Sequence, residues 1–366
     1  MGDGDGFDGV MKSGVACRVD QPHDQRADRT PTQLEGADVA EVVSRWNVGA
    51  VTTTAVPDTG TVNQTVLLTT GGGRFVLRGY RHRERVPVDR EHAVIAHVRA
   101  RGLPAVAPLP LPGGDTILER AGRYYALFPW AAGRQVPRGA LGRGEAAAMG
   151  AFLARLQQVL QSFPVDQVPI PRLSYASYAF TRRATLAKID ELEATVRAVA
   201  HVDSLAPTVL ALLAGQRAHV EVLPDTAGIY FGPLALQVTH GDYQESNLFF
   251  GDTGPAQESA VSAIIDWDQT CLAPRAWEVI RTIEFAFGFE PTKCQQFLRG
   301  YRSEQPLPLE DLDVAAAAYD IKASHSLWVY EELYVQGNRR VARFLDGAKV
   351  FVPVAERWRQ VRESCT

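Results

Sequence analysis

The chain has 366 residues, of which 46% are hydrophobic and 22% are charged, and its formal net charge is −4. This composition is close to that of soluble globular proteins, and the length suits two lobes or one large domain. The charge balance gives no reason to expect a nucleic-acid partner, and no apolar run approaches the roughly 20 residues of a membrane-spanning helix. The cysteines are scattered without a CxxC pair, which excludes a disulfide scaffold and a structural zinc module. We therefore expect a cytoplasmic protein with no membrane partner.

Residues 1–32 are polar, rich in glycine and aspartate and without hydrophobic periodicity, which predicts a flexible N-terminal tail. A helical pattern begins near Leu34, and then β-branched runs with a period of two follow, separated by PDTG and GGG. These runs predict an antiparallel meander, with GGG as a hairpin turn. A helix with its N-cap at Asp89 and two more strands, DTILERAG and RYYALFPW, complete a small β-rich lobe at 33–129.

After the connector at 129–133 the pattern becomes mainly helical. GEAAAMGAFLARLQQVLQSF and TRRATLAKIDELEATVRAVA are long amphipathic helices, and strands return only around LALQVTH, SNLFF and VSAIIDW. From Pro274 the pattern is helical again. The sequence therefore predicts a larger, mainly helical second lobe at 130–366.

The segment THGDYQESNLFF, followed by SAIIDWD, has the residue types that phosphoryl transfer requires. That reaction needs a base near the attacking hydroxyl, oxygen ligands for Mg²⁺ and cations on the phosphates. Asp242 and Asn247 stand in D-x-x-x-x-N spacing directly after one predicted strand, and Asp266 ends another. The three side chains offer one base and two oxygen ligands for Mg²⁺. The alternative interpretation is that Asp242 is a turn residue and Asn247 a loop cap.

The motifs HGDYQESN and IIDWD resemble the catalytic segments of the aminoglycoside phosphotransferase and choline kinase-like family. The resemblance extends from the meander near 48 to FLRGYR at 297–302. It implies a bilobal, protein-kinase-like α+β fold and activity on small molecules rather than proteins. It also implies that Asp242 is the catalytic base, that Asn247 and Asp266 hold Mg²⁺, and that His240 supports the loop.

In the small lobe, FVLRGYR resembles the strand that carries the phosphate-contacting lysine of this family, and REHAVIAHV the helix with its glutamate partner. The resemblance makes Arg78 and Glu91 the candidate pair. The chain departs from the family here, because it has no lysine between residues 13 and 187. Arginine keeps the charge but differs in reach and geometry. The alternative is a surface arginine on an exposed strand.

Two further segments of the small lobe are candidates for nucleotide contacts. DTGTVNQ is the expected nucleotide loop, in which Gly60 permits a sharp turn and Asn63 approaches the phosphates. Residues 126–130 match the family's connector beside adenine, at Phe128 and Trp130. Pro129 has no N–H, so the expected donor to adenine is the Trp130 N–H.

The leading hypothesis is an ATP- and Mg²⁺-dependent kinase, with GTP not excluded, that acts as a monomer or a homodimer on the hydroxyl of a small molecule. Acidic and aromatic residues of the second lobe favour an amine-bearing alcohol, such as an amino sugar, homoserine or choline. The candidates for lining this acceptor site are Trp277, Glu278, Glu284, His325, Trp328, Tyr330, Glu331 and Glu332. A catalytically silent nucleotide-binding module is the alternative, supported by arginine at position 78. A protein kinase is disfavoured because no activation loop or A-P-E segment follows Asp266.

Overall fold

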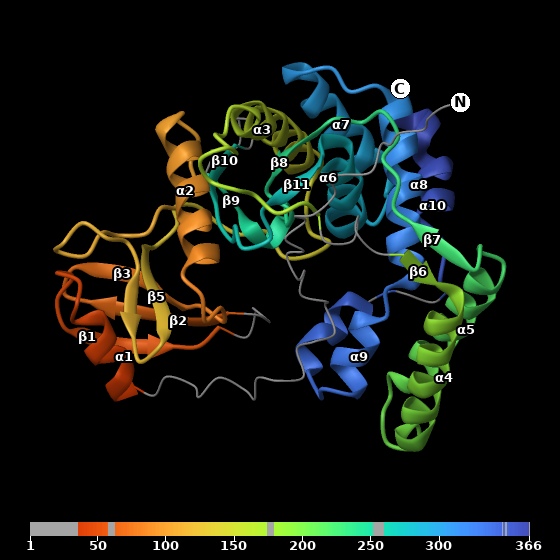
Figure 1. The fold of residues 1–366 in the computed structure, drawn as a ribbon, viewed down its shortest axis with the longest axis horizontal. Coiled ribbons are helices and arrows are strands. Elements are labelled where there is room, and N and C mark those ends of the chain that lie inside the picture. Colours follow the sequence, from red (N-terminus) through yellow and green to blue (C-terminus); the bar gives the residue numbers. More distant parts are fainter. Residues whose placement is uncertain are drawn as a thin grey trace, which may run out of the picture. The chain divides into compact units, whose positions relative to one another are not determined.

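The computed structural model describes residues 36–57, 63–173, 179–251, 260–345, 347 and 350–365 (Figure 1). All of them fall within one unit, Leu34–Thr366. The tail predicted for 1–32 and the turn predicted at Gly60 lie outside the described residues.

A five-stranded antiparallel sheet in the order β1-β2-β3-β5-β4 forms the first part of the described chain (Figure 1). Its elements, with the two helices that pack on it, are α1 (Gly36–Val43), β1 (Val51–Ala55), β2 (Gln64–Thr70), β3 (Gly73–Gly79), α2 (Val86–Ala100), β4 (Leu118–Arg120) and β5 (Arg123–Pro129). Side chains alternate along β5, as the pleat of a strand requires. Tyr125 and Leu127 pack with α1 on one face of the sheet, whereas Tyr124 and Ala126 pack with Val88 of α2 on the other.

Glycine residues allow the tight hairpin turns of this sheet. Thr70 pairs with Gly73, so the predicted GGG turn is confirmed. Ala121 and Gly122 both have positive φ, 51° and 68°, between β4 and β5. Two consecutive left-handed residues are typical of the tight turn that matches strand twist.

The rest of the described chain is mainly helical. Its elements are α3 (Arg143–Gln161), β6 (Ala179–Thr181), α4 (Arg182–Val199), α5 (Ala206–Glu221), β7 (Thr226–Gly228), β8 (Leu236–Thr239), η3 (Glu245–Asn247), β9 (Leu248–Phe250), β10 (Val261–Ile264), β11 (Cys271–Pro274), α6 (Arg275–Thr282), the π-helical turn η4 (Ile283–Phe287), α7 (Pro291–Glu304), α8 (Leu309–His325), α9 (Trp328–Tyr334), η5 (Arg339–Leu345), α10 (Val354–Arg362) and η6 (Glu363–Cys365). Two antiparallel strand pairs, β8 with β11 and β9 with β10, carry the loops between these helices.

Helices α3 and α7 approach each other through glycine. A Cβ on Gly150 of α3 would lie 1.9 Å from the Phe297 carbonyl oxygen, and one on Gly300 of α7 would lie 2.0 Å from the Ala147 carbonyl oxygen. Any larger side chain would push the backbones apart. The two glycines therefore bring α3 against α7, and the large core forms around this contact.

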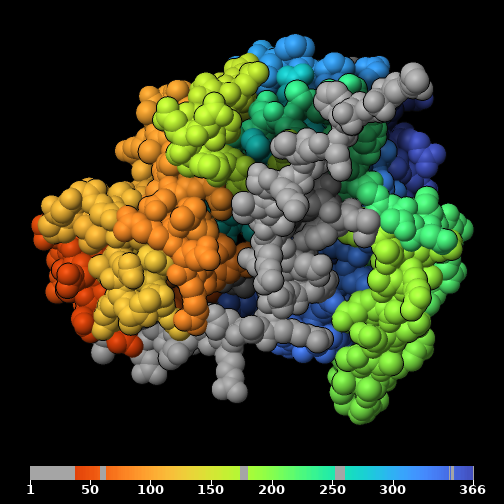
Figure 2. Space-filling model, in the orientation of Figure 1, coloured from red at the N-terminus to blue at the C-terminus, as the bar shows by residue number. Residues whose placement is uncertain are grey.

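A second, smaller core lies between α4, α5, α9 and η5 and includes Ile189, Leu213, Leu333 and Val341. In the space-filling view, the hairpin of α4 and α5 projects at the lower right, in green (Figure 2). Helices α4 and α5 therefore pack with α9 and η5 around a core that is separate from the large one.

The expected α+β fold, with a small antiparallel sheet and a larger helical part, is confirmed. The lobe boundaries at 33–129 and 130–366 stay a prediction. The sequence analysis did not foresee the short strands β6, β7 and β11 or the π-helical turn η4. No helix in the described residues has the length and apolar character that crossing a membrane requires.

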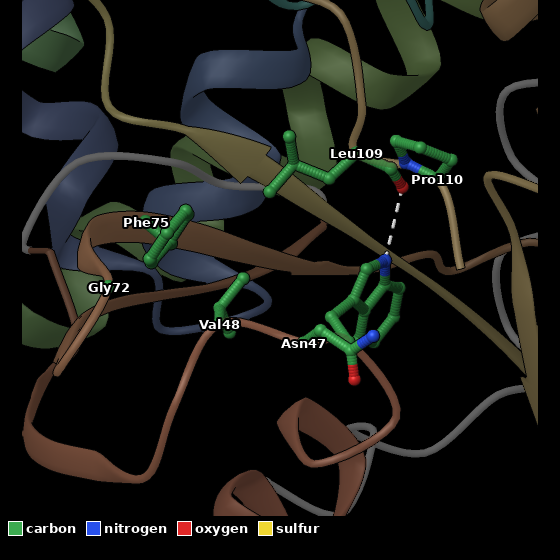
Figure 3. A pocket seen from close by; sticks show the side chains of 7 residues that line it. Asn47, Val48, Gly72, Phe75, Leu109 and Pro110 are labelled. Atoms are coloured by element: carbon green, nitrogen blue, oxygen red, sulfur yellow. Dashed lines mark hydrogen bonds between the residues drawn. The ribbon is translucent and has the colours of Figure 1, made fainter. Parts of the chain in front are cut away.

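One hollow in the described surface lies beside α1 on the small sheet (Figure 3). It is lined by Trp46, Asn47, Val48, Gly72, Phe75, Leu109 and Pro110. The Trp46 indole N–H donates to the Leu109 carbonyl at 3.1 Å, which fixes one wall. Leu77 packs on this face of β3, so its neighbour Arg78 points to the opposite face.

Candidate active site

The predicted catalytic loop leaves β8 through a glycine that no other residue can replace without a shift of the backbone. Gly241 has φ +81°, and a Cβ there would lie 2.0 Å from the Gln269 carbonyl oxygen. Both the left-handed conformation and the close approach require glycine. The loop is therefore held against the segment after β10 at the residue just before Asp242.

His240 links the same two segments through its imidazole ring, which is fully buried. Its Nε2 lies 3.1 Å from the Ile265 carbonyl oxygen, and its Nδ1 accepts from the Asp242 backbone N–H at 3.3 Å. This pattern requires a neutral ring with its proton on Nε2. Burial lowers the pKa of His240 to about 4, which agrees with the neutral form.

The Asp242 carboxylate receives four side-chain hydrogen bonds. Arg281 of α6 donates to Oδ1, and the Asn247 amide donates to Oδ2 at 2.9 Å. The Gln244 amide lies 3.1 and 3.0 Å from Oδ1 and Oδ2. Burial alone would raise the pKa of Asp242, but the charge of Arg281 and the neighbouring donors lower it below its ordinary value. The structure thus holds an ionised carboxylate in one orientation.

Asn247 joins the loop to the strand that leads to Asp266. Its amide nitrogen also donates to the Asp242 carbonyl at 2.8 Å, and its own carbonyl accepts from the Ile265 N–H at 3.0 Å. Since the amide nitrogen is committed to the loop, Oδ1 is the atom with which Asn247 would hold a metal. Asp266 itself has φ +69°, an uncommon conformation for a residue with a side chain. Such conformations cluster at functional sites.

Glu278 of α6 takes a different place from the one expected. It was a candidate for the acceptor site, but it is buried, and its carboxylate accepts from the Gly241 N–H at 2.8 Å and from the Gln157 amide at 2.9 Å. Burial raises its pKa. Glu278 therefore supports the backbone of the loop from behind and does not face an acceptor.

Three carboxylates surround the Arg78 guanidinium. Its Nη2 lies 2.8 Å from Asp266 Oδ1 and 3.4 Å from Asp268 Oδ2, and its Nη1 lies 3.4 Å from Glu91 Oε1. The Asn63 amide also donates to Asp268 Oδ2 at 3.0 Å. Arg78 is thus a largely covered, paired residue and not an arginine on an exposed strand face.

This cluster carries more negative than positive charge. Burial raises the pKa of Glu91 to about 7 despite the opposing charge of Arg78. Burial and the charge of Asp266 raise the pKa of Asp268 to about 6. Three carboxylates share the one guanidinium of Arg78, with the charge of Arg81 also acting on Asp268, and a divalent cation would supply the positive charge that such a cluster lacks.

The donors present suit magnesium in type and number. Mg²⁺ is bound through one or two protein carboxylates, and phosphates and water complete its shell. Asp266, Asp268 and the Asn247 amide offer such oxygens. In the described ranges no group of three or more His, Cys, Asp and Glu side chains is arranged as a metal cage, which is compatible with this sparse type of site.

The structure does not support the adenine donor expected from the sequence. The Trp130 N–H donates to the Arg74 carbonyl at 3.2 Å, which extends the ladder between β3 and β5. The Arg74 guanidinium covers the indole ring, 3.5 Å from its centre. The contact of Phe128 and Trp130 with a nucleotide stays a prediction, and the Trp130 N–H is not its natural donor.

The other acceptor candidates lie in varied surroundings. Trp277 belongs to the large core, where its ring contacts that of Tyr319 at a tilt of 56°, and Tyr330 belongs to the smaller core. His325 contacts the Thr185 hydroxyl at 2.7 Å. Trp328 packs against Phe344, with ring centres 5.3 Å apart, and Phe344 packs in turn against Phe285. Trp328 is the candidate that these contacts link to the catalytic loop. The Arg281 guanidinium, which binds Asp242, lies over the Phe285 ring at 4.6 Å.

The family model described as "Phosphotransferase enzyme family" matches residues 53–317, which include every element of the site. The chain belongs to this family. Among its relatives, the homoserine kinase of Rhodopseudomonas palustris (strain BisB18) is 27% identical over 292 residues, covering 77% of this chain and 79% of that protein. The homoserine kinase of Afipia carboxidovorans is 26% identical over 288 residues, covering 75% and 78%.

Solved structures of other phosphotransferases share the fold. A spectinomycin phosphotransferase in complex with ADP and spectinomycin matches with a TM-score of 0.56 at 13% identity, covering 90% of this chain and 97% of its own. A microcompartment-associated aminopropanol kinase matches with a TM-score of 0.54 at 15% identity, covering 90% and 98%. The expected family and its protein-kinase-like fold are thereby confirmed, and the chain is a kinase of small molecules.

The sequence analysis missed two side chains that the structure brings into the site. Asp268 was visible in the motif IIDWD as a second carboxylate two positions after Asp266, and that repetition was the available signal. Arg281 gave no such signal, because it lies in a helix 39 residues from Asp242.

Proposed function

We propose that this phosphotransferase transfers the γ-phosphoryl group of ATP, in the presence of Mg²⁺, to the hydroxyl of a small amine-bearing alcohol. The observation that carries the proposal is the Asp242 carboxylate, which is kept ionised and oriented beside Asn247 and the segment that ends in Asp266. GTP in place of ATP is not excluded, since solved neighbours carry AMP-PNP, ADP or GDP.

In the proposed mechanism, each charged side chain has a separate task. Asp242 orients the acceptor hydroxyl and takes its proton as the bond to phosphorus forms. Asn247, Asp266 and Asp268 hold Mg²⁺, which neutralises charge on the phosphates when it is bound. Arg78, paired with Glu91, contacts the phosphates. The rate then comes from positioning and electrostatics and needs no covalent intermediate.

Homoserine is the first acceptor to test, because the two relatives described above are named homoserine kinases. The amino sugars and choline remain candidates within the amine-bearing class. A catalytically silent nucleotide-binding module is the second candidate function, and the observation that favours it is arginine at position 78, where the family has lysine.

The test is acceptor-dependent release of ADP or GDP by the purified chain with a panel of alcohols. Asp242→Asn should lower the rate by about two to four orders of magnitude and leave Mg-nucleotide affinity nearly unchanged. Asp266→Ala should weaken Mg²⁺-dependent nucleotide binding. Asp166→Asn, an exposed aspartate outside the site, is the matched control.

Two results would count against the proposal. Near-normal turnover by Asp242→Asn removes this residue from the role of base. Nucleotide binding without turnover of any acceptor favours the silent module.

A further inference from the structure

The acidic side chains expected to receive an amine are already engaged. Glu278 accepts from the loop backbone, as described above. Glu284 lies 3.6 Å from Arg357, Glu331 lies 3.2 Å from Lys188, and Glu332 accepts from the Asn338 amide at 2.9 Å. The carboxylates of Glu284 and Glu331 are paired with cations and that of Glu278 is buried, so these three offer little uncompensated negative charge to a cationic acceptor.

Positive charge gathers instead beside Asp242. Starting from that carboxylate, Arg281 lies over the Phe285 ring, and Phe285 contacts Phe344 with ring centres 6.3 Å apart. Arg138 and Arg343 each lie 5.0 Å from the centre of the Phe344 ring. We call these five residues (Arg281, Phe285, Phe344, Arg138 and Arg343) the arginine–phenylalanine cluster. It is continuous from the catalytic carboxylate outward.

The cluster comes from three separate stretches of the chain. Arg281 and Phe285 belong to α6 and η4, Arg343 and Phe344 to η5, and Arg138 to the segment before α3. The charges of Arg138 and Arg343 both act on Glu245, which lies in the same loop as Asp242. The two arginines therefore face the catalytic loop.

The positive charge of the cluster is only partly matched. Arg281 pairs through Nη2 with Asp242, but its Nη1 is buried and has no hydrogen-bond partner among the residues that the structure describes. Within the described residues, no acidic side chain forms an ion pair with the exposed Arg138 or with Arg343, although the charges of both act on the nearby Glu245 carboxylate. A buried guanidinium nitrogen without an acceptor is costly, so the cluster is suited to an additional anion.

We propose that the acceptor carries a carboxylate, which the arginine–phenylalanine cluster binds while its hydroxyl lies at Asp242. This inference rests on the proposed kinase activity and narrows its substrate class. Guanidinium groups bind carboxylates through two parallel hydrogen bonds, and the phenylalanine rings limit the water that competes for them. Of the acceptors considered above, homoserine has a carboxylate, whereas choline and amino sugars are cations without one.

The test compares four alcohols that differ in charge. Homoserine has a carboxylate and an amine, homoserinol lacks the carboxylate, γ-hydroxybutyrate lacks the amine, and kanamycin is a polycation. We expect kcat/KM for homoserine to exceed that for homoserinol by about tenfold or more, with kanamycin inactive. γ-Hydroxybutyrate should retain more activity than homoserinol. Glycerol phosphate, an alcohol that carries a phosphate, is added to test whether the cluster prefers a phosphate to a carboxylate.

Variants outside the catalytic loop test the residues. Arg343→Gln and Arg138→Gln should each raise the KM for homoserine by about tenfold, with kcat, nucleotide affinity and the KM for homoserinol unchanged. Arg299→Gln removes an exposed arginine of α7 and should change none of these values. Unchanged nucleotide affinity shows that a variant is folded.

The outcomes separate this inference from the function on which it rests. Efficient phosphorylation of homoserinol or kanamycin would overturn the carboxylate proposal and leave the kinase in place. A preference for glycerol phosphate, or an equal rise in KM for homoserine and homoserinol in Arg343→Gln, would also overturn it. Turnover of no alcohol despite nucleotide binding would instead refute the proposed kinase activity.

Discussion

Removal of the Glu278 carboxylate should destabilise the protein and slow catalysis without a change in any residue that faces the substrate. Glu278 accepts from the Gly241 N–H at 2.8 Å and from the Gln157 amide at 2.9 Å, and its side chain is buried. A buried donor that loses its partner costs about 1–3 kcal/mol. Glu278→Ala leaves two such donors, so we expect a loss of about 2–6 kcal/mol in the free energy of unfolding.

Glu278→Gln is the milder change, because it keeps one acceptor oxygen and the shape of the side chain. It should cost about 1–3 kcal/mol, a large part of the 5–15 kcal/mol typical of a domain, yet leave the protein folded. Since Gly241 directly precedes Asp242, a displacement of about 1 Å there should lower kcat by about 100-fold. Nucleotide affinity should change little.

The assay is denaturant unfolding together with acceptor-dependent ADP release. Glu304→Gln at the end of α7 is the matched control, because its ion pair with Arg155, at 4.0 Å, is half-exposed and should be worth no more than about 1 kcal/mol. The reasoning fails if Glu278→Ala unfolds within about 1 kcal/mol of the wild type, or if Glu278→Gln keeps its full kcat.

Three further predictions concern packing, pH and nucleotide contact. Gly150→Ala should destabilise the protein by about 1–3 kcal/mol or more, measured by urea unfolding, because its Cβ would lie 1.9 Å from a carbonyl oxygen of α7; wild-type stability would disprove the close contact. The pKa of His240 is lowered from 6.5 to about 4. The neutral ring therefore contributes about 3 kcal/mol to the free energy of unfolding above pH 6.5, and this contribution is lost as the pH falls toward 4. The stability difference between wild type and His240→Gln should therefore shrink over that range, and parallel curves would contradict the assignment. Arg78→Met should raise the KM for ATP about tenfold and Arg78→Lys less, since lysine restores the charge; equal effects would mean that charge at this position does not matter.

The site residues that could be predicted from the sequence are those fixed by local spacing. Asp242 and Asn247 lie in one loop. Asp266 lies just after β10, which pairs with β9, the strand that begins directly after Asn247, so the proximity of the three residues follows from short-range order. The contact of Asn63 with Asp268 spans 205 residues, and no local pattern predicts it.

Glu278 shows a different reason for failure. Its helix is buried on most sides, with Trp277, Val279 and Ile280 also in the core. A glutamate in such a helix is expected to face a site or solvent, because burial of a carboxylate is costly. The hydrogen bond from the Gly241 backbone N–H supplies part of the compensation, and the sequence alone does not show where that N–H lies. The same holds for Arg281, whose partner is set by the packing of α6 against the loop.

The absence of lysine from the small lobe has a consequence for chemical labelling. Nucleotide analogues that acylate or sulfonylate amines report kinases through the lysine beside the phosphates. A nucleotide bound next to Arg78 as proposed would meet a guanidinium, which stays protonated and does not react as an amine. Surveys based on amine-directed probes would therefore overlook the nucleotide site of this kinase. Dicarbonyl reagents selective for arginine would instead modify Arg78, and bound nucleotide would protect Arg78 from them.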